Sequence, residues 1–513
     1  MFTKRQYAIN TVVNYLAYSS NIIIALVLSP YVVSYLGDTF YGVWSIIVAL
    51  TGYYSFLDFG IRQGVSQYVS RYLSSGDYKN FNKTLNSALV MLSGIGVAAA
   101  LITVLVGLQF GDSLVKGGLE SKVIISSFMI LGCGIGIKFP LLLFQTVVTG
   151  KNRYDIAGLI SFVVKIIQGI STWFVLSKGY GIIGLALVTT AAQIVESVLM
   201  MVAAWILVPQ IRFNFSDLDI ASLKDVVKYG FWNFIVGIAG QTTLYVGPLL
   251  IGKMLGPELV TYYSIGANLI PYYGSFVGIL SIPLLQLVIA KDVKQETEEL
   301  REMYLHGSRY VTLITTFIAF GLIVFGKQFL GKWMGMKYVS GDLCSSYTIM
   351  VILSIAMMIE LTQTIGRQIL FGVRKNKFLA IIYGGSSITT FIITLLSIKL
   401  YAATGAAMAL LVHSVVTSGI LLPFYLCRYL KIGLWYYFKN CIALNMIFFC
   451  TMTILGKALV TRAEIGSWFE LILPICVASL MYLALGGFLI IGKDLLFKVA
   501  QSQMLRIAAW RKI

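Results

Sequence analysis

Charged side chains interrupt several stretches of this chain that are otherwise apolar. They are Asp58, Arg62, Lys138, Lys165, Glu196, Glu360 and Arg367. A charge at the centre of a lipid bilayer costs from about 2.5 to more than 10 kcal/mol, so such a residue faces the protein interior or water. Lysine and arginine are suited to bind phosphate groups. These residue types therefore predict a binding site for an anion inside a bundle of helices.

We assign these side chains to two roles. The candidate substrate-binding residues are Lys138, Arg62, Arg367, Lys165, Tyr53 and Tyr272, and the candidate gating or coupling residues are Asp58, Glu360 and Glu196. No catalytic residue and no metal ligand is assigned, because the cysteines and histidines lack ligand spacing. Tyr53 and Tyr272 each offer an aromatic face for stacking and a hydroxyl for a hydrogen bond to a ligand. The alternative for both tyrosines is simple packing.

Asp58 and Arg62 are four residues apart and can pair on one face of a helix. One interpretation is a structural ion pair that stiffens the inner end of its span. The other is a gate that opens when an anionic ligand competes for Arg62. Both interpretations stay open at the level of the sequence.

Lys138 and Glu360 are separated by 222 residues, the same offset that places Gly150 on Gly372. They therefore occupy equivalent depths on equivalent helices of a repeat. We expect Lys138 to be a cavity cation, with a buried salt bridge of no transport role as the alternative. We also expect Lys138 and Glu360 to meet across the two lobes when substrate is absent; the alternative is that each faces its own lobe.

The composition defines the elements that must hold these residues. Of 513 residues, 58% are hydrophobic and 12% are charged, with 39 Lys and Arg against 21 Asp and Glu. A soluble protein has about a quarter of its residues charged. This excludes a globular enzyme, a disordered chain and a nucleic-acid binder, despite a net charge of +18. The sequence predicts an all-α polytopic membrane protein.

Apolar runs bounded by Gly, Pro or charges predict about 14 transmembrane helices. They lie near 9–35, 40–67, 84–109, 121–149, 155–177, 181–208, 228–254, 259–289, 305–327, 343–371, 378–399, 404–427, 438–458 and 468–491. The segments on the side of the N-terminus hold 26 Lys and Arg and those on the other side hold 10. The positive-inside rule then places both termini in the cytoplasm, in a multi-pass protein of the bacterial inner membrane.

An internal repeat organises these helices. An offset of 219 places Asn14 on Asn233 and Leu36-Gly37 on Leu255-Gly256, and an offset of 221 places Gly184 on Gly405. We expect an N-lobe over 1–209 (spans 1–6) and a C-lobe over 210–430 (spans 7–12), as parallel six-helix repeats around a central cavity. Two extra spans over 431–491 and a cytoplasmic basic amphipathic tail over 492–513 complete the chain.

The N-terminal motifs carry a resemblance to a family. The stretches YVVSYLGDTFYGVWSII and TGYYSFLDFGIRQGVSQYVSRYLSSGDYKNFN, and the turn TG-KNRYD at 149–155, resemble the pattern of bacterial polysaccharide flippases. These belong to the multidrug/oligosaccharidyl-lipid/polysaccharide (MOP) exporter superfamily. The resemblance implies a non-enzymatic flippase that moves an undecaprenyl-pyrophosphate-linked repeat unit across the cytoplasmic membrane by alternating access. Such export supplies O-antigen, capsule or exopolysaccharide.

Two other functions compete with this one. An ion-coupled multidrug exporter of the same superfamily would favour an acidic cavity for cations, and a membrane glycan polymerase or ligase would carry a large outer loop, which the short outer segments here do not offer. The sequence contains no Walker-type loop, so we expect no nucleotide cofactor and coupling to an H+ or Na+ gradient. The expected partners are the lipid-linked oligosaccharide, membrane lipid, and the polysaccharide polymerase and chain-length machinery, with no nucleic acid.

Overall fold

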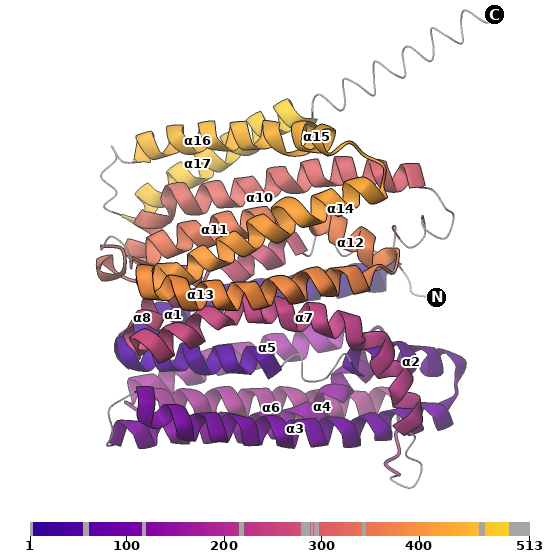
Figure 1. Ribbon diagram of the computed structural model, residues 1–513. Helices are drawn as coiled ribbons and strands as arrows, with labels where there is room; N and C mark the ends of the chain where they lie inside the picture. The colour runs from indigo at the N-terminus through magenta and orange to yellow at the C-terminus, as the bar shows by residue number, and fades with distance from the viewer. Residues whose placement is uncertain are drawn as a thin grey trace, which may run out of the picture. The chain divides into compact units, whose positions relative to one another are not determined.

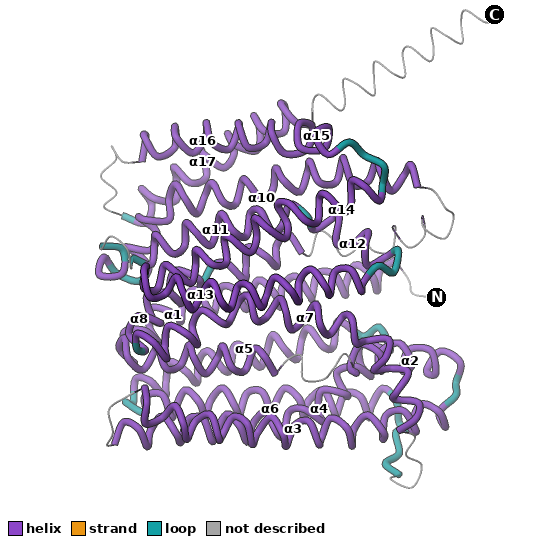
Figure 2. The backbone as a smooth tube through the Cα atoms, viewed as in Figure 1, coloured by secondary structure: helices purple, strands orange, loops and turns teal. Residues whose placement is uncertain are grey.

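The computed structural model describes residues 4–54, 61–114, 119–214, 220–278, 288, 291, 297–340, 345–460 and 467–491. Every regular element in these ranges is a helix, as the tube in Figure 2 shows. The chain divides into two compact units, Met1–Thr261 and Tyr262–Ile513, which are described separately below. The predicted all-α membrane fold is confirmed.

The first unit consists mainly of long helices, and those between residues 78 and 207 run alternately in opposite directions. They are α1 (Lys4–Tyr54), α2 (Ile61–Ser75), α3 (Tyr78–Leu114), α4 (Leu119–Gly150), α5 (Tyr154–Ser177), α6 (Gly181–Leu207) and α7 (Ile220–Leu255), and α8 (Pro257–Ala267) crosses into the second unit. Figure 1 shows α3, α4 and α6 side by side, while α1 packs on α5. The start of α3, the end of α4 and the end of α6 consequently lie at one end of the unit.

The core of the first unit forms where α2, α3, α4 and α6 meet. Phe81, Leu85 and Val147 are fully buried there. Glycines let α3 and α4 approach closely, because a Cβ on Gly96 would lie 2.8 Å from the carbonyl oxygen of Gly136. Small residues serve this purpose in membranes, where lipid tails are as apolar as leucine and close packing must hold helices together.

The second unit contains helices that are more often interrupted. They are α10 (Thr297–Trp333), η2 (Met336–Tyr338), α11 (Ser346–Thr362), α12 (Thr364–Gly372), α13 (Asn376–Ser414), η3 (Val415–Leu421), α14 (Leu422–Tyr429), α15 (Leu434–Tyr437), η4 (Phe438–Ala443), α16 (Leu444–Val460), α17 (Trp468–Gly486) and η5 (Gly487–Ile491). The η3, η4 and η5 segments are π-helical. Such bulges are frequent at functional sites, and η3 adjoins the polar cluster described below.

Eleven helices of the described chain are long and apolar enough to cross a membrane. One of them, Ser19–Tyr53, overlaps both of the first two predicted spans (9–35 and 40–67), and the backbone breaks between them at Gly37 (φ 69°) inside α1. Another, Asn376–Tyr429, covers predicted spans 11 and 12, which separate at Tyr401 and Ala402. Predicted span 8 (259–289) lies partly outside the described residues. The count of 14 remains a prediction.

The predicted repeat has a counterpart in the backbone. Gly37 and Gly256, which the 219 offset pairs, both have positive φ, at 69° and 98°. Asn152 and Arg374, paired by the 222 offset, have φ of 56° and 59°, although neither is a glycine. A left-handed conformation is uncommon for such residues, so its recurrence at matched turns indicates a shared local fold. The predicted lobe boundaries at 209 and 430 stay predictions.

Gly42 in α1 provides a test of helix packing in the first unit. A Cβ at this position would lie 1.8 Å from the carbonyl oxygen of Pro257, a backbone atom that cannot rotate away. We expect Gly42→Ala to lower the free energy of unfolding of the purified protein by about 1–3 kcal/mol, because overpacking strains the packed helices. Thermal unfolding measures the change. Gly94→Ala is the matched control, because nothing lies within 4 Å of its added Cβ and alanine favours helix. Equal stability of the two variants would contradict this packing.

Candidate functional site: polar groups within the membrane helices

Lys138 lies in the interior of α4, twelve residues before its end at Gly150. At 1.5 Å per residue this is about 18 Å from the helix end, well inside the hydrocarbon zone. The side chain is half-buried, and its Nζ donates a hydrogen bond to Oε1 of Gln193 on α6 at 3.3 Å. The amide of a neighbouring helix therefore helps to hold the lysine.

Two further charges of the first unit lie on α5 and α6. The Ser161 hydroxyl on α5 donates to the carboxylate of Glu196 on α6. Lys165 donates to Oε1 of Gln168, one turn further along α5, at 3.0 Å. All these side chains are half-buried. Hydroxyl and amide groups thus support the charges at mid-membrane in the first unit.

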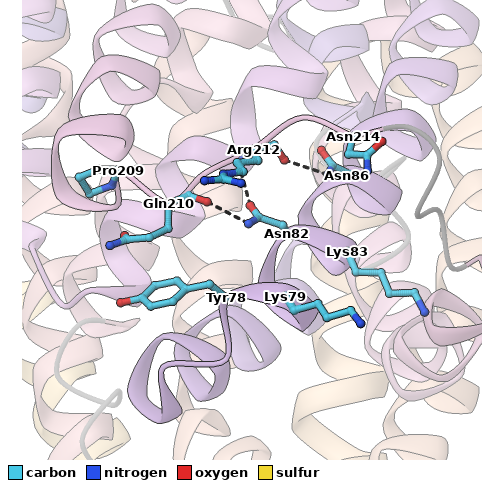
Figure 3. Close-up of a pocket in the computed structure, with 9 residues that line it drawn as sticks. All are labelled: Tyr78, Lys79, Asn82, Lys83, Asn86, Pro209, Gln210, Arg212 and Asn214. Atoms are coloured by element: carbon cyan, nitrogen blue, oxygen red, sulfur yellow. Dashed lines mark hydrogen bonds between the residues drawn. The ribbon is translucent and has the colours of Figure 1, made fainter.

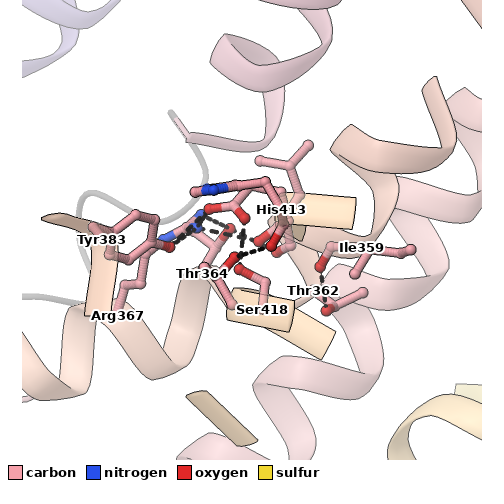
Figure 4. Close-up of polar contacts among 10 residues, drawn as sticks. Ile359, Thr362, Thr364, Arg367, Tyr383, His413 and Ser418 are labelled. Atoms are coloured by element: carbon pink, nitrogen blue, oxygen red, sulfur yellow. Dashed lines mark hydrogen bonds and ion pairs between the residues drawn. The ribbon is translucent and has the colours of Figure 1, made fainter. Parts of the chain in front are cut away.

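Glu360 and Arg367 form an ion pair in the second unit, at the junction of α11 and α12. Figure 4 shows Arg367 with its neighbours Thr364 and Tyr383. Both side chains are 19% exposed. Tyr383 on α13 donates from its hydroxyl to Glu360 Oε1 at 2.7 Å and accepts from Arg367 at 3.0 Å. Ser418 in η3 donates to Glu360 Oε2 at 2.6 Å. The carboxylate thus has a partner for each oxygen, and its charge is matched by a guanidinium.

Further polar side chains adjoin the Glu360–Arg367 pair. Arg367 also donates to the hydroxyl of Thr364 at 3.1 Å. Next to it, Nδ1 of the buried His413 lies 2.9 Å from Oγ1 of Thr390, and its ring is 6.2 Å from that of Tyr383. The second unit therefore holds a network in which a guanidinium matches the charge of the carboxylate.

The described contacts of Lys138 and Glu360 are with residues of their own unit. Lys138 contacts α6 and Glu360 contacts η3, which lie in the predicted sixth and twelfth spans. This corresponds to the alternative in which each residue serves its own lobe. Arg367 is occupied by Glu360, Tyr383 and Thr364 in this conformation, and its predicted role toward substrate stays a prediction.

The predicted tyrosines have different neighbours. Tyr53 is half-buried, and its ring lies 6.1 Å from that of Tyr245 on α7. Tyr272 is also half-buried, but its neighbour Tyr273 is buried and donates to the carbonyl of Thr315 at 2.6 Å. The Tyr273 contact is typical of a packing role. Asp58 lies outside the described residues, and of Arg62 only its place in the first turn of α2 is described.

The sequence analysis did not single out Ser161, Gln193, Tyr383 or Ser418. The signal that finds two of them is the repeat itself, since an offset of 222 places Ser161 on Tyr383, and both donate a hydrogen bond to a glutamate carboxylate. Uncharged polar residues are too common in membrane helices to be selected by type alone. Their equivalent positions in the predicted repeat distinguish Ser161 and Tyr383 from the other uncharged polar residues.

Comparisons with known proteins give a consistent result. A family model described as "Polysaccharide biosynthesis protein" matches residues 8–285. A Shigella flexneri protein named "Putative O-antigen transporter" is 21% identical over 413 residues, which is 78% of this chain and 93% of that protein.

Solved structures resemble the fold over most of its length. One described as "Lipid II flippase MurJ, inward closed conformation" has a TM-score of 0.70 at 14% identity, covering 95% of this chain and all of that one. An inward-facing multidrug resistance MATE family transporter of the MOP superfamily has a TM-score of 0.66 at 15% identity, covering 83% of this chain and 97% of that one. At such identities the likeness establishes the fold.

Proposed function

Because the chain belongs to the polysaccharide biosynthesis protein family, with the fold of MOP-superfamily transporters, we propose that it is a flippase for lipid-linked oligosaccharides. The resemblance of its N-terminal motifs to polysaccharide flippases is confirmed by the family match over 8–285. The proposed substrate is an undecaprenyl-pyrophosphate-linked repeat unit, which moves from the inner to the outer leaflet by alternating access. The named relatives are transporters and flippases, which supports a function without catalysis.

The observation that carries this proposal is Lys138 at mid-membrane depth. A pyrophosphate that crosses the bilayer must exchange its hydration for fixed cations. Lys138 is supported by Gln193, a neutral side chain that can remain bonded to one ammonium hydrogen while others reach a phosphate. A ligand shifts a conformational equilibrium only through contacts that differ between the two states. A lysine–phosphate contact made in one state supplies such a difference.

Energy for directional export comes, in this proposal, from an H+ or Na+ gradient. Glu360 is the carboxylate that we assign to coupling, because it lies buried among Arg367, Tyr383 and Ser418 at the junction of two helices. Binding of a cation there requires these partners to rearrange. The ion pair and the helix junction would then change together, which links the ion to the conformation.

We place the protein in the bacterial inner membrane with both termini in the cytoplasm. The polysaccharide polymerase and the chain-length machinery are its proposed partners on the outer side, where the flipped repeat unit is consumed. The excess of Lys and Arg on the side of the N-terminus supports this orientation. Labelling of single cysteines introduced at Asn152 and Lys178, at opposite ends of α5, tests it with a membrane-impermeant reagent.

A deletion strain tests the function directly. We expect it to accumulate lipid-linked oligosaccharide on the cytoplasmic leaflet, because synthesis continues while export stops. The chain supplied from a plasmid is expected to restore surface polysaccharide. Purified protein in vesicles should likewise expose a labelled lipid-linked oligosaccharide on the opposite leaflet. Normal export in the deletion strain, together with drug sensitivity, would favour a multidrug exporter instead.

A further inference from the structure

A cavity of about 600 Å³ lies at the end of the first unit where α3 begins and the segment after α6 passes (Figure 3). Its lining is polar and basic: Tyr78, Lys79, Asn82, Lys83, Asn86, Pro209, Gln210, Arg212 and Asn214. The volume falls in the range of small-molecule sites, about 300–1,000 Å³. None of these residues belongs to the mid-membrane groups described above, so the proposed transport function does not account for the cavity.

Two asparagines of α3 build the cavity by holding the segment that follows α6. Asn82 donates from Nδ2 to the carbonyl of Gln210 at 2.9 Å and accepts at Oδ1 from the backbone N–H of Arg212 at 3.0 Å. Asn86, one turn further, donates to the carbonyl of Arg212 at 3.0 Å. Figure 3 shows these bonds fixing the backbone of Arg212 beside α3. The wall of the cavity is therefore an organised structure.

The charges of the lining favour an anion. Lys79, Lys83 and Arg212 supply three cations, and no lining residue is acidic. The carboxylate nearest in sequence, Asp77, caps α3 through the N–H and the side chain of Asn80. These hydrogen bonds lower the pKa of Asp77, so it remains ionised and occupies the helix end. An anion in the cavity is consequently recognised by the side-chain cations.

Asn86 indicates what else the ligand carries. Its side chain is 1% exposed, and its Oδ1 is buried without a hydrogen-bond partner. A buried acceptor without a donor is unfavourable, and a hydroxyl group of a ligand at this wall would satisfy it. Asn214 and Gln210 add further amides, and Tyr78 offers a ring face to a sugar. The lining thus combines phosphate-binding cations with groups suited to hydroxyls.

We infer that this cavity binds a phosphorylated sugar. The inference rests on the proposed function for its biological role, which is to receive the sugar-phosphate headgroup at the membrane surface before transport. The same chemistry is present in soluble sugar phosphates and in lipid headgroups, and the experiment separates these two sources. The binding site itself is tested without any transport measurement.

The test uses the full-length protein in phosphatidylcholine nanodiscs, with glucose 1-phosphate, glucose and inorganic phosphate as probes for calorimetry. We expect glucose 1-phosphate to bind more tightly than either of the others. Lys79→Gln with Lys83→Gln should weaken its binding at least tenfold, because two cations are lost at exposed or half-buried positions that do not support the core. Lys151→Gln, at the same end of the unit but outside the cavity, is the matched control and should bind as the wild type does.

The variant Asn86→Ala tests recognition of the sugar separately from recognition of the phosphate. We expect this variant to lose the preference for glucose 1-phosphate over inorganic phosphate while its affinity for inorganic phosphate stays within twofold. Should the variant fail to fold, the lysine variant alone decides the site. Equal binding of glucose 1-phosphate by wild type and the lysine variant, or no binding by the wild type of this probe and of the lipid probe below, would overturn the inference.

A lipid arm identifies the source of the ligand. Phosphatidylinositol is added to the nanodiscs at five molecules per hundred lipids, and bound lipid is counted by native mass spectrometry. Retention that the lysine variant loses assigns the cavity to a membrane headgroup, while binding of soluble glucose 1-phosphate alone assigns it to a soluble sugar phosphate; both support the site. A protein that flips lipid-linked oligosaccharide but binds neither probe keeps the proposed function and refutes this inference.

Discussion

Replacement of Lys138 by alanine is expected to abolish glycan export. The variant removes the cation that we assign to the pyrophosphate, about 18 Å from the helix end, where water cannot replace it. A hydrogen bond to a charged group is worth about 1.5–3 kcal/mol, which corresponds to one to two orders of magnitude in rate when it is made only in the transport step. Export by the deletion strain carrying the variant measures the loss.

The controls distinguish charge from folding. Lys138→Arg keeps the positive charge and should retain part of the activity. Lys178→Ala removes an exposed lysine at the C-terminal end of α5, and this variant should export glycan as the wild type does. Membrane insertion of each variant is checked by the amount of purified protein. A well-inserted Lys138→Ala protein with wild-type export would refute the assigned role.

Breaking the Glu360–Arg367 pair is expected to give the largest loss of stability. Arg367→Met leaves a carboxylate buried without its guanidinium, which costs about 3–5 kcal/mol. Glu360→Gln leaves the opposite charge alone, with a similar loss. The double variant removes both charges and should regain most of the stability. Thermal unfolding of the four proteins in detergent measures the coupling.

An exposed pair serves as the comparison for this cycle. Glu298 and Arg301 lie 3.4 Å apart on the surface of α10, and the glutamate side chain is 74% exposed. Glu298→Gln should change stability by less than about 1 kcal/mol. Losses in the two buried single variants that simply add in the double variant would show that Glu360 and Arg367 do not act as a pair.

The sequence was sufficient for the fold because its apolar runs are long and uniform. Helix formation in lipid is forced by the need to satisfy every backbone polar group, so hydropathy predicts the spans well. Two backbone breaks lie where the sequence predicts boundaries between spans, because Gly37 falls between 35 and 40 and Tyr401 and Ala402 fall between 399 and 404. The interruption at Gln363 lies inside the predicted span 343–371 and was not predicted.

The partner of Glu360 could not be predicted for a physical reason. Residues seven apart on a continuous helix share a face but are separated by about 10.5 Å along the axis. Glu360 and Arg367 meet because the helix is interrupted at Gln363, between α11 and α12. Gln363 is buried, where Tyr304 donates to its Oε1 at 3.0 Å and its Nε2 donates to Tyr437 at 2.9 Å. These contacts come from distant helices, which local sequence does not report.

Under the proposed function, the unequal mid-membrane charge of the two units would make transport sensitive to membrane voltage. At mid-membrane, the described part of the first unit has Lys138, Lys165 and Glu196, a formal charge of +1, while Glu360 and Arg367 cancel in the second. A bound pyrophosphate diester, with two negative charges, would change the net mid-membrane charge of the first unit from +1 to about −1.

A cell interior that is electrically negative drives negative charge outward and positive charge inward, by about 2.3 kcal/mol per charge per 100 mV for a full crossing. Under the proposed function, the loaded protein is pushed toward the outside and the empty one back toward the cytoplasm. The membrane potential then favours export in both halves of the cycle, in proportion to the fraction of the field that Lys138 crosses.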